Sequence, residues 1–256
     1  MLLAIDVGNT ETKLGLFDNG HKELVHHWRV TTESRRTADE YGVFVTQLFA
    51  TAGVKSNQID AVVISSVVPR LDHTLVEVAE KFFNVEPRIL SAESQQLIKV
   101  KTHHPAEVGA DLIACAIGGV ERHGAPLILV SYGTATVFMA ISTAGEYLGV
   151  AIAPGINISI DALIGRTAKL PQIALDAPAH AIGRNTVEAL QAGIIFGFVG
   201  QTEALVARMR AELGIDAPVV ATGGLAGVVA ANAPVIGAVD PHLSLYGLRA
   251  FAMVAP

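Results

Sequence analysis

Short apolar runs and longer amphipathic stretches alternate along the chain, with polar turns between them. The run Leu2–Ile5 leads into a turn at Gly8–Thr10, and a second apolar run, Leu14–Phe17, follows it. Gly and Asn tolerate the positive φ angles of tight turns, so this pattern predicts a β-hairpin. Three further strands, over residues 23–31, 59–68 and 85–90, and two helices, over 37–52 and 71–83, are expected after it.

The second half of the chain repeats this order. A helix over residues 111–122 is expected to join two halves, 1–118 and 119–256, and the strand pattern starts again at Ala125. The later elements expected are strands over 147–152 and 218–222 and helices over 157–167, 186–212 and 243–253.

A second hairpin, over residues 127–141, is the clearest sign of duplication. It has an apolar strand, a turn at Gly133-Thr134, a further threonine at Thr136 and another apolar strand. When the glycines of the two turns are aligned, Ser131 stands where Asp6 stands in the first hairpin. Two such hairpins predict an α/β protein with a duplicated fold, whose halves face each other across a cleft.

Composition narrows the class of protein. The 256 residues are 51% hydrophobic and carry a formal net charge of −6. A nucleic-acid binder needs clustered Lys and Arg, so that class is not expected. The single cysteine, Cys115, lies in an apolar run and is expected to be a buried structural thiol. Apolar runs such as 192–199 fall short of the roughly 20 residues that span a bilayer. With no signal peptide in view, we expect a cytoplasmic protein without membrane or nucleic-acid partners.

The first hairpin carries the residue types of a phosphate site. Its turn offers backbone N–H groups, Thr10 and Thr12 offer hydroxyls, Lys13 offers a cation, and Asp6 offers an acid. Together such groups can hold a nucleoside triphosphate with its Mg²⁺. The alternative from these residues alone is an ordinary hairpin with a polar tip.

A carboxylate stands in a second promising place. Asp111 follows a Gly-Ala turn at the start of the predicted linking helix, which would project its side chain into a cleft. A kinase that acts on a hydroxyl needs a carboxylate within hydrogen-bond reach of that hydroxyl. The local alternative is a helix N-cap, and one residue can serve both roles.

Six motifs occur in the order found in type III pantothenate kinases, and the resemblance covers essentially the whole chain. They are residues 6–10 with Lys13, 109–111, 133–136, 153–155, 183–186 and 222–224. That family belongs to the acetate kinase/sugar kinase/heat-shock/actin superfamily. The resemblance implies duplicated ribonuclease H-like domains, the actin-like ATPase/kinase fold. It also implies a homodimer that uses ATP to phosphorylate pantothenate to 4′-phosphopantothenate, the first step of coenzyme A biosynthesis.

The resemblance assigns roles to particular residues, with Asp111 as the catalytic base. The residues expected to hold ATP are Asp6, Val7, Gly8, Asn9, Thr10, Glu11, Thr12, Lys13, Thr134, Gly223 and Gly224. The residues expected near the substrate are Gly109, Ala110, Asp111, Leu112, Thr102 and Thr186, the last reaching across the dimer. Asp6 would position Mg²⁺, and Ser131 occupies the position associated with a monovalent cation, K⁺ or NH₄⁺.

Three of these positions depart from the family pattern. The family typically has Asp where this chain has Ser131, Arg where it has Leu112, and Tyr where it has Thr102. A guanidinium pairs with a carboxylate in a bidentate manner, and a charge-assisted contact contributes about 1.5–3 kcal/mol. Two alternatives therefore stay open at this point: a non-catalytic nucleotide-binding relative, or a kinase for another small alcohol.

Overall fold

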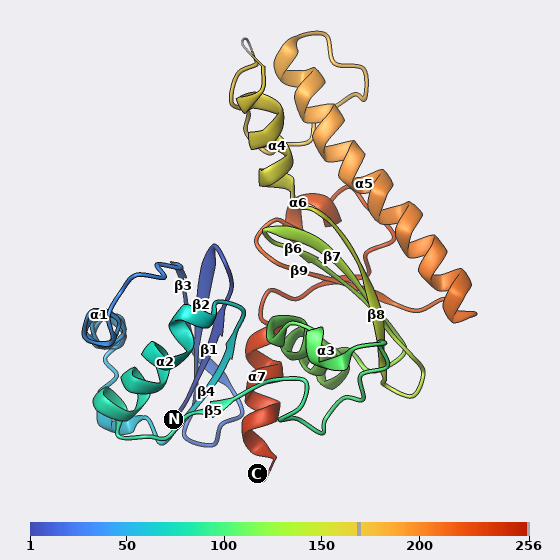
Figure 1. Cartoon of the computed structure of the whole chain (residues 1–256). Coiled ribbons are helices and arrows are strands. Elements are labelled where there is room, and N and C mark those ends of the chain that lie inside the picture. The colour runs from blue at the N-terminus through green and yellow to red at the C-terminus, as the bar shows by residue number, and fades with distance from the viewer. Residues whose placement is uncertain (168–169, 255–256) are drawn as a thin grey trace. The chain divides into compact units, whose positions relative to one another are not determined.

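The computed structural model describes residues 1–167 and 170–254, and the chain divides into two compact units (Figure 1). The first unit comprises residues 1–122 and the chain from Leu243 onward, and the second comprises residues 123–242. This division differs from the expected one, because the segment that begins at Leu243 packs with the first unit. The passage between units also comes at residue 122 instead of 118.

A five-stranded sheet forms the centre of the first unit, in the order β3-β2-β1-β4-β5. Its strands are β1 (Leu2–Val7), β2 (Glu11–Phe17), β3 (Leu24–Thr31), β4 (Ala61–Ser66) and β5 (Arg88–Ile89). The strands β1, β2 and β3 pair antiparallel, whereas β4 runs parallel to β1. The predicted first hairpin is confirmed, and the Gly8 N–H donates to the Glu11 carbonyl at 3.0 Å across its turn.

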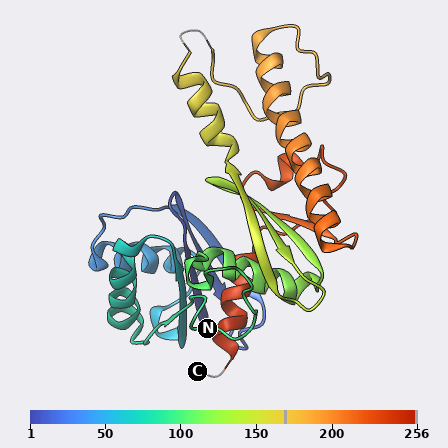
Figure 2. The same ribbon diagram turned by 45° about the vertical axis from the view of Figure 1, so that its right-hand side comes forward.

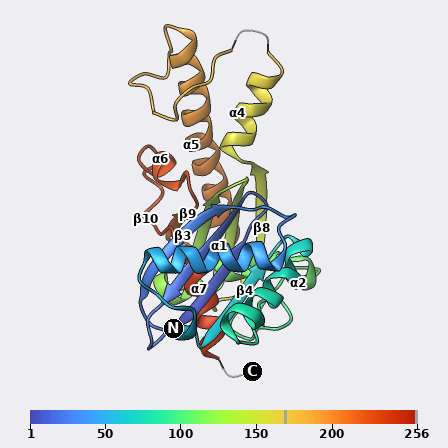
Figure 3. The same cartoon turned by 90° about the vertical axis from the view of Figure 1, so that its left-hand side faces the viewer.

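One face of this sheet buries a cluster of large apolar side chains. Leu3, Ile5 and Val7 alternate along β1 and pack with residues of α1 (Ala38–Thr51) and α2 (Pro69–Val78), which continues as a π-helix over Ala79–Phe83. Figure 3 shows α1 lying across this face. Thr37 begins α1 with a capping box, since its hydroxyl accepts from the Glu40 N–H and Glu40 accepts from the Thr37 N–H.

The other face of the sheet carries α7 (Leu243–Met253), which contacts β1, β2 and β4. Small residues let this helix come close: a Cβ on Gly15 would lie only 2.9 Å from the Leu245 side chain. The linking helix α3 (Ala110–His123) crosses α7 where Gly118 and Gly247 meet. Cys115 is buried in α3, as predicted.

The second unit repeats the sheet. Its strand order is β10-β9-β6-β7-β8, and β6 pairs with its neighbours as β1 does. The strands are β6 (Leu127–Tyr132), β7 (Ala135–Ile141), β8 (Tyr147–Pro154), β9 (Val219–Thr222) and β10 (Ala238–Val239). The predicted duplication is therefore confirmed at the level of strand order and direction.

The helices of the second unit are α4 (Ile156–Gly165), α5 (Thr186–Leu213) and the short α6 (Ala226–Ala230). Phe198, Val199 and Val206 of α5 pack on the apolar face of the sheet. The first part of α5 runs beside α4 beyond the end of that sheet (Figure 2). The sequence pattern predicted α4 and α5, whereas α6 and β10 were not expected.

By length and composition alone, α5 is long and apolar enough to cross a membrane. Sequence reasoning considered only uninterrupted apolar runs such as residues 192–199 and therefore did not identify this helix as a candidate membrane span. One such helix is a weak indication, because core helices of other proteins meet the same criterion. Only 28% of its most apolar window is buried within the chain. The helix therefore presents apolar surface to its surroundings, and the absence of a membrane partner stays a prediction.

Candidate active site

The carboxylate of Asp6 is the most heavily contacted group of the predicted site. Asp6 lies in β1, directly between Lys13 of β2 and Ser65 of β4 in the strand register. The Ser65 hydroxyl donates to Oδ1 at 2.8 Å, and the Lys13 ammonium donates to Oδ2 at 3.3 Å. Because register partners point to the same face, all three side chains lie on the face opposite the α1 and α2 cluster.

A third donor reaches Asp6 from the far end of the chain. Ser244, in the first turn of α7, donates its hydroxyl to Asp6 Oδ2 at 2.6 Å. Asp6, Ser65 and Ser244 are 4%, 0% and 1% exposed. Sequence reasoning treated Ser65 only as the end of a strand and missed Ser244, since 238 residues separate it from Asp6.

Lys13 is the cation of this group. Burial lowers the pKa of its ammonium, but the charge of Asp6 and the hydrogen bond to it raise that pKa more, with further help from Cys115 and Glu11. The net shift is upward, so Lys13 is charged at neutral pH. A charged ammonium beside the hairpin turn suits the predicted phosphate site.

The turn residues fall into two groups. Asn9 and Thr10 are exposed at the tip, and Glu11 pairs with Arg29 at 2.8 Å. Val7 belongs to the apolar cluster on the opposite face, and Thr12 is its register partner. The Thr12 hydroxyl shares a hydrogen bond of 2.9 Å with Thr32. The side chains of Val7 and Thr12 thus face away from Asp6, which leaves only their backbone for the contact that sequence reasoning gave them.

Asp111 lies in the first turn of α3, in the same unit as Asp6. The Leu112 N–H donates to Asp111 Oδ1 at 2.8 Å. Burial and the charge of Asp6 raise the pKa of the Asp111 carboxyl, against the opposing effects of that hydrogen bond and of Lys13. A Cβ on Gly109 would lie 2.6 Å from Oδ1, so a side chain at this position would displace the Asp111 carboxylate. The structure therefore brings Asp6, Lys13 and Asp111 within electrostatic range of one another.

The residues predicted to lie near the substrate belong to three separate parts of the chain. Gly109, Ala110 and Leu112 surround Asp111 at the start of α3 and are partly buried. The Thr102 hydroxyl is buried without a hydrogen-bond partner among the described residues. A buried donor without a partner is costly, so this hydroxyl is suited to a ligand or a water. Thr186 is the exposed first residue of α5, after the N-cap Asn185.

The second unit holds the remaining predicted residues around its own hairpin. Ser131 pairs with Val137 of β7 and Thr222 of β9, the register positions of Lys13 and Ser65. Thr134 is exposed at the turn, and Thr136 donates to the Pro154 carbonyl at 3.3 Å. Gly223 has a φ of +95°, and a Cβ there would lie 2.4 Å from the Tyr132 carbonyl. The two residues after β9, Gly223 and the exposed Gly224, therefore carry no side chain that would keep a ligand away from the backbone.

A metal ion at this site would rely on few protein ligands. No group of three or more His, Cys, Asp and Glu side chains that could hold an ion occurs among the described residues. Mg²⁺ in nucleotide sites is held by one or two carboxylates together with phosphate oxygens and waters. The single buried carboxylate of Asp6 fits that mode.

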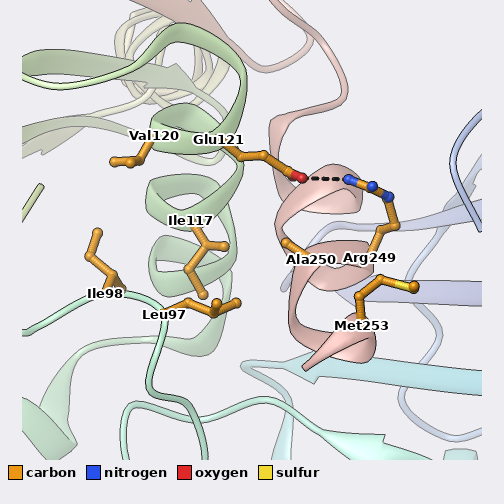
Figure 4. A pocket seen from close by; sticks show the side chains of 8 residues that line it. All are labelled: Leu97, Ile98, Ile117, Val120, Glu121, Arg249, Ala250 and Met253. Atoms are coloured by element: carbon orange, nitrogen blue, oxygen red, sulfur yellow. Dashed lines mark hydrogen bonds and ion pairs between the residues drawn. The ribbon is translucent and has the colours of Figure 1, made fainter. Parts of the chain in front are cut away.

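A separate cavity of about 280 Å³ opens near the other end of α3 and α7 (Figure 4). It is lined mainly by apolar side chains, and the ion pair between Glu121 and Arg249 borders it. None of the predicted site residues lines it.

Comparisons with known proteins agree with the motif resemblance. The family model described as type III pantothenate kinase matches residues 2–208. The type III pantothenate kinases of Myxococcus xanthus and Moorella thermoacetica are each 49% identical over 249 residues. These alignments cover 97% of this chain and 96% and 97% of the two relatives.

Solved structures of lower identity share the fold. A protein described as a Baf family transcriptional activator from Campylobacter jejuni gives a TM-score of 0.61 at 18% identity, covering 97% of this chain and 96% of that one. The activator of 2-hydroxyisocaproyl-CoA dehydratase from Clostridium difficile gives 0.52 at 11%, covering 98% and 92%. With the near-complete alignments to its curated relatives, the chain belongs to the type III pantothenate kinase family.

Proposed function

We propose that this protein transfers the γ-phosphoryl group of ATP to the hydroxyl of pantothenate, which forms 4′-phosphopantothenate and ADP. The observation that carries the proposal is the grouping of Asp6, Lys13 and Asp111 in a chain of this family. A buried acid–cation pair suits the phosphates, and a separate carboxylate with a raised pKa suits the acceptor.

Asp111 acts as the general base in this proposal. Its carboxylate accepts the hydroxyl proton of pantothenate while the hydroxyl oxygen attacks the γ-phosphorus and ADP leaves. The raised pKa makes the Asp111 carboxylate a stronger proton acceptor than an exposed aspartate. The nearby charge of Lys13 opposes that rise, which favours the ionised form that a base needs.

Asp6 and Lys13 serve the nucleotide. Asp6 would hold Mg²⁺, which neutralises charge on the transferring group when bound. Lys13 presents its ammonium beside the turn of Gly8, Asn9 and Thr10, where backbone N–H groups add donors. In the second unit, Thr134 offers a hydroxyl, and Gly223 and Gly224 let backbone approach the nucleoside.

The acceptor is proposed to lie beside Asp111, with Gly109, Ala110 and Leu112 around it. Thr102 supports this placement through its buried hydroxyl without a partner among the described residues. Thr186 would reach the acceptor from a second copy of the chain in a homodimer. The apolar exposed side chains of α4 and α5, including Ile158 at 46% and Val187 at 41% exposed, support such an interface.

A monovalent cation, K⁺ or NH₄⁺, is part of the proposal through the family. Ser131 contributes one neutral oxygen at the position in question, and Thr222 is its register partner. Neutral oxygens can coordinate such an ion, but they attract it less than a carboxylate does. We therefore expect activity to need a higher concentration of K⁺ or NH₄⁺ than an enzyme with Asp at this position.

The test is ADP release by the purified protein with ATP, Mg²⁺, pantothenate and a titration of K⁺ or NH₄⁺. We expect release that depends on pantothenate and falls by about 10²–10⁴-fold in Asp111→Asn, the range for loss of a general base. ADP release that is independent of pantothenate at every cation concentration would refute the proposal. Release that survives in Asp111→Asn would refute the role of Asp111.

A further inference from the structure

The Asp6 carboxylate is fixed by donors from three different elements. Ser65 of β4 contacts Oδ1, while Lys13 of β2 and Ser244 of α7 contact Oδ2. A carboxylate offers about four lone-pair positions, so the three contacts leave about one free position. Three contacts from different directions also define the plane of the carboxylate.

We propose that Ser244, together with Ser65, is a positioning residue that orients Asp6 toward the nucleotide-bound Mg²⁺. The proposal rests on the proposed function in one respect, the role of Asp6 toward that metal. Ser244 lies outside residues 2–208 that the family model matches, so that match does not assign it a role.

The chemistry of the donors supports this role. Two hydroxyls orient the carboxylate without neutralising it, so that Asp6 keeps its charge for a cation. Lys13 is the only charged donor of the three, and at 3.3 Å its contact is the longest. Without the Ser244 hydroxyl, Lys13 would be the only donor to Oδ2 among the described residues, and we expect the carboxylate to turn toward the ammonium. That rotation would weaken the orientation of Asp6 toward the metal.

The packing of α7 explains how a distant serine is held so accurately. The helix is pressed against α3 at the contact of Gly118 with Gly247 and against β2 at Gly15. Ser244 stands one turn before Gly247, so both contacts hold its hydroxyl at the sheet. Its contact distance of 2.6 Å with Asp6 lies in the usual range for a charge-assisted hydrogen bond from a hydroxyl to a carboxylate.

The experiment measures ADP affinity by calorimetry with Mg²⁺ and with EDTA. The quantity compared is the dissociation constant in EDTA divided by the dissociation constant in Mg²⁺, which rises with the help that the metal gives to binding. We expect Ser244→Ala to reduce this ratio by about fivefold or more while the affinity in EDTA stays within about twofold. Ser65→Ala should act in the same direction. In an Asp6→Asn background, Ser244→Ala should change the ratio no further, because residues that act through one group are not additive.

A matched control separates positioning from stability. Ser142 accepts two backbone N–H groups in a turn of the second unit, so Ser142→Ala also removes a bonded hydroxyl. It should leave the ratio unchanged. If Ser244→Ala does not fold, Ser244→Cys keeps the shape with a weak donor and carries the same test.

A normal ratio in Ser244→Ala with a lower unfolding temperature would show a purely structural role and overturn the inference. An equal loss of affinity with and without Mg²⁺ would overturn it as well, as would an additive effect in the Asp6→Asn background. The assay contains no acceptor. Failure of pantothenate turnover would therefore refute the proposed function and leave this test intact.

Discussion

The crossing of α3 and α7 makes a sharp prediction about Gly247. A Cβ added there would lie 1.8 Å from the Ala114 carbonyl oxygen and 2.9 Å from the Gly118 nitrogen. Ordinary contact of a Cβ begins at 3.4 Å, so Gly247→Ala demands a separation of about 1.6 Å at this point. Both obstructing atoms are backbone and cannot rotate away.

The magnitude follows from two opposing effects. Overpacking a well-packed contact costs about 1–3 kcal/mol, and an obstruction by backbone belongs at the upper end. Alanine is better than glycine in a helix by about 1 kcal/mol, which offsets part of that cost. We expect a net loss of about 2 kcal/mol in the free energy of unfolding. For a chain of this size that loss lowers the melting temperature by roughly 4–8 °C.

Urea unfolding of the wild type, Gly247→Ala and Gly227→Ala provides the assay. Gly227 also lies in a helix, α6, but a Cβ there meets nothing within 4 Å. The control variant should be neutral or slightly more stable than the wild type. Gly247→Ala should also disturb the contact of Ser244 with Asp6, since Ser244 lies one turn earlier on the same helix.

A Gly247→Ala variant as stable as Gly227→Ala would refute this account of the helix crossing. A variant that loses stability but keeps a normal Mg²⁺ effect on ADP binding would refute the link from the crossing to Asp6. The two results are independent, because one reports packing and the other reports the position of a hydroxyl.

Three further variants test the site. Asp111→Asn should raise the free energy of unfolding in urea at pH 8 and leave it unchanged near pH 4. The pKa of the Asp111 carboxyl is raised in the folded protein, so the fold favours the protonated carboxyl and loses stability as the pH rises and the carboxyl ionises. A loss of stability at pH 8 would contradict this sign. Leu112→Arg should lower the KM for pantothenate by about ten- to a hundredfold through a charge-assisted pair with the substrate carboxylate, and an unchanged KM would contradict the placement of the acceptor. Ser131→Asp should lower the melting temperature in choline chloride and recover it in KCl, whereas equal melting temperatures in the two salts would show that no cation binds there.

The two hairpins could be predicted from the sequence because their signals are local. Each combines an apolar run, a glycine turn and a second apolar run within about 15 residues. The capping of α1 and the glycine after α5, which has a φ of +68° at Gly214, are equally local. The order of helices and strands was predicted from the spacing of apolar positions, and the duplication was predicted by aligning the two glycine turns.

The contacts of Asp6 could only partly be predicted. Lys13 lies seven residues away in the same hairpin, so its proximity follows from the turn. Ser244 lies on α7, and no local sequence pattern predicts which of the two similar sheets the C-terminal helix packs against. Sequence reasoning did not consider which face of the sheet Thr12 lies on. A hairpin alternates sides, and Thr12 is the partner of Val7, one residue beyond the pair of Asp6 with Lys13.

The duplicated register gives a physical reason for the departure from the family pattern that the sequence predicts at Ser131. In the first sheet, Asp6 stands beside Lys13, so its charge is paired within the chain. In the second sheet, Val137 occupies the place of Lys13 beside Ser131. A carboxylate at residue 131 would therefore have no cation beside it from β7, and a bound K⁺ or NH₄⁺ would have to supply that charge. Serine removes this requirement, since a neutral hydroxyl can be partly buried without a counter-ion. The residue at 131 thus fits a site that binds its cation weakly, and the response of Ser131→Asp to KCl tests whether a carboxylate there requires the cation.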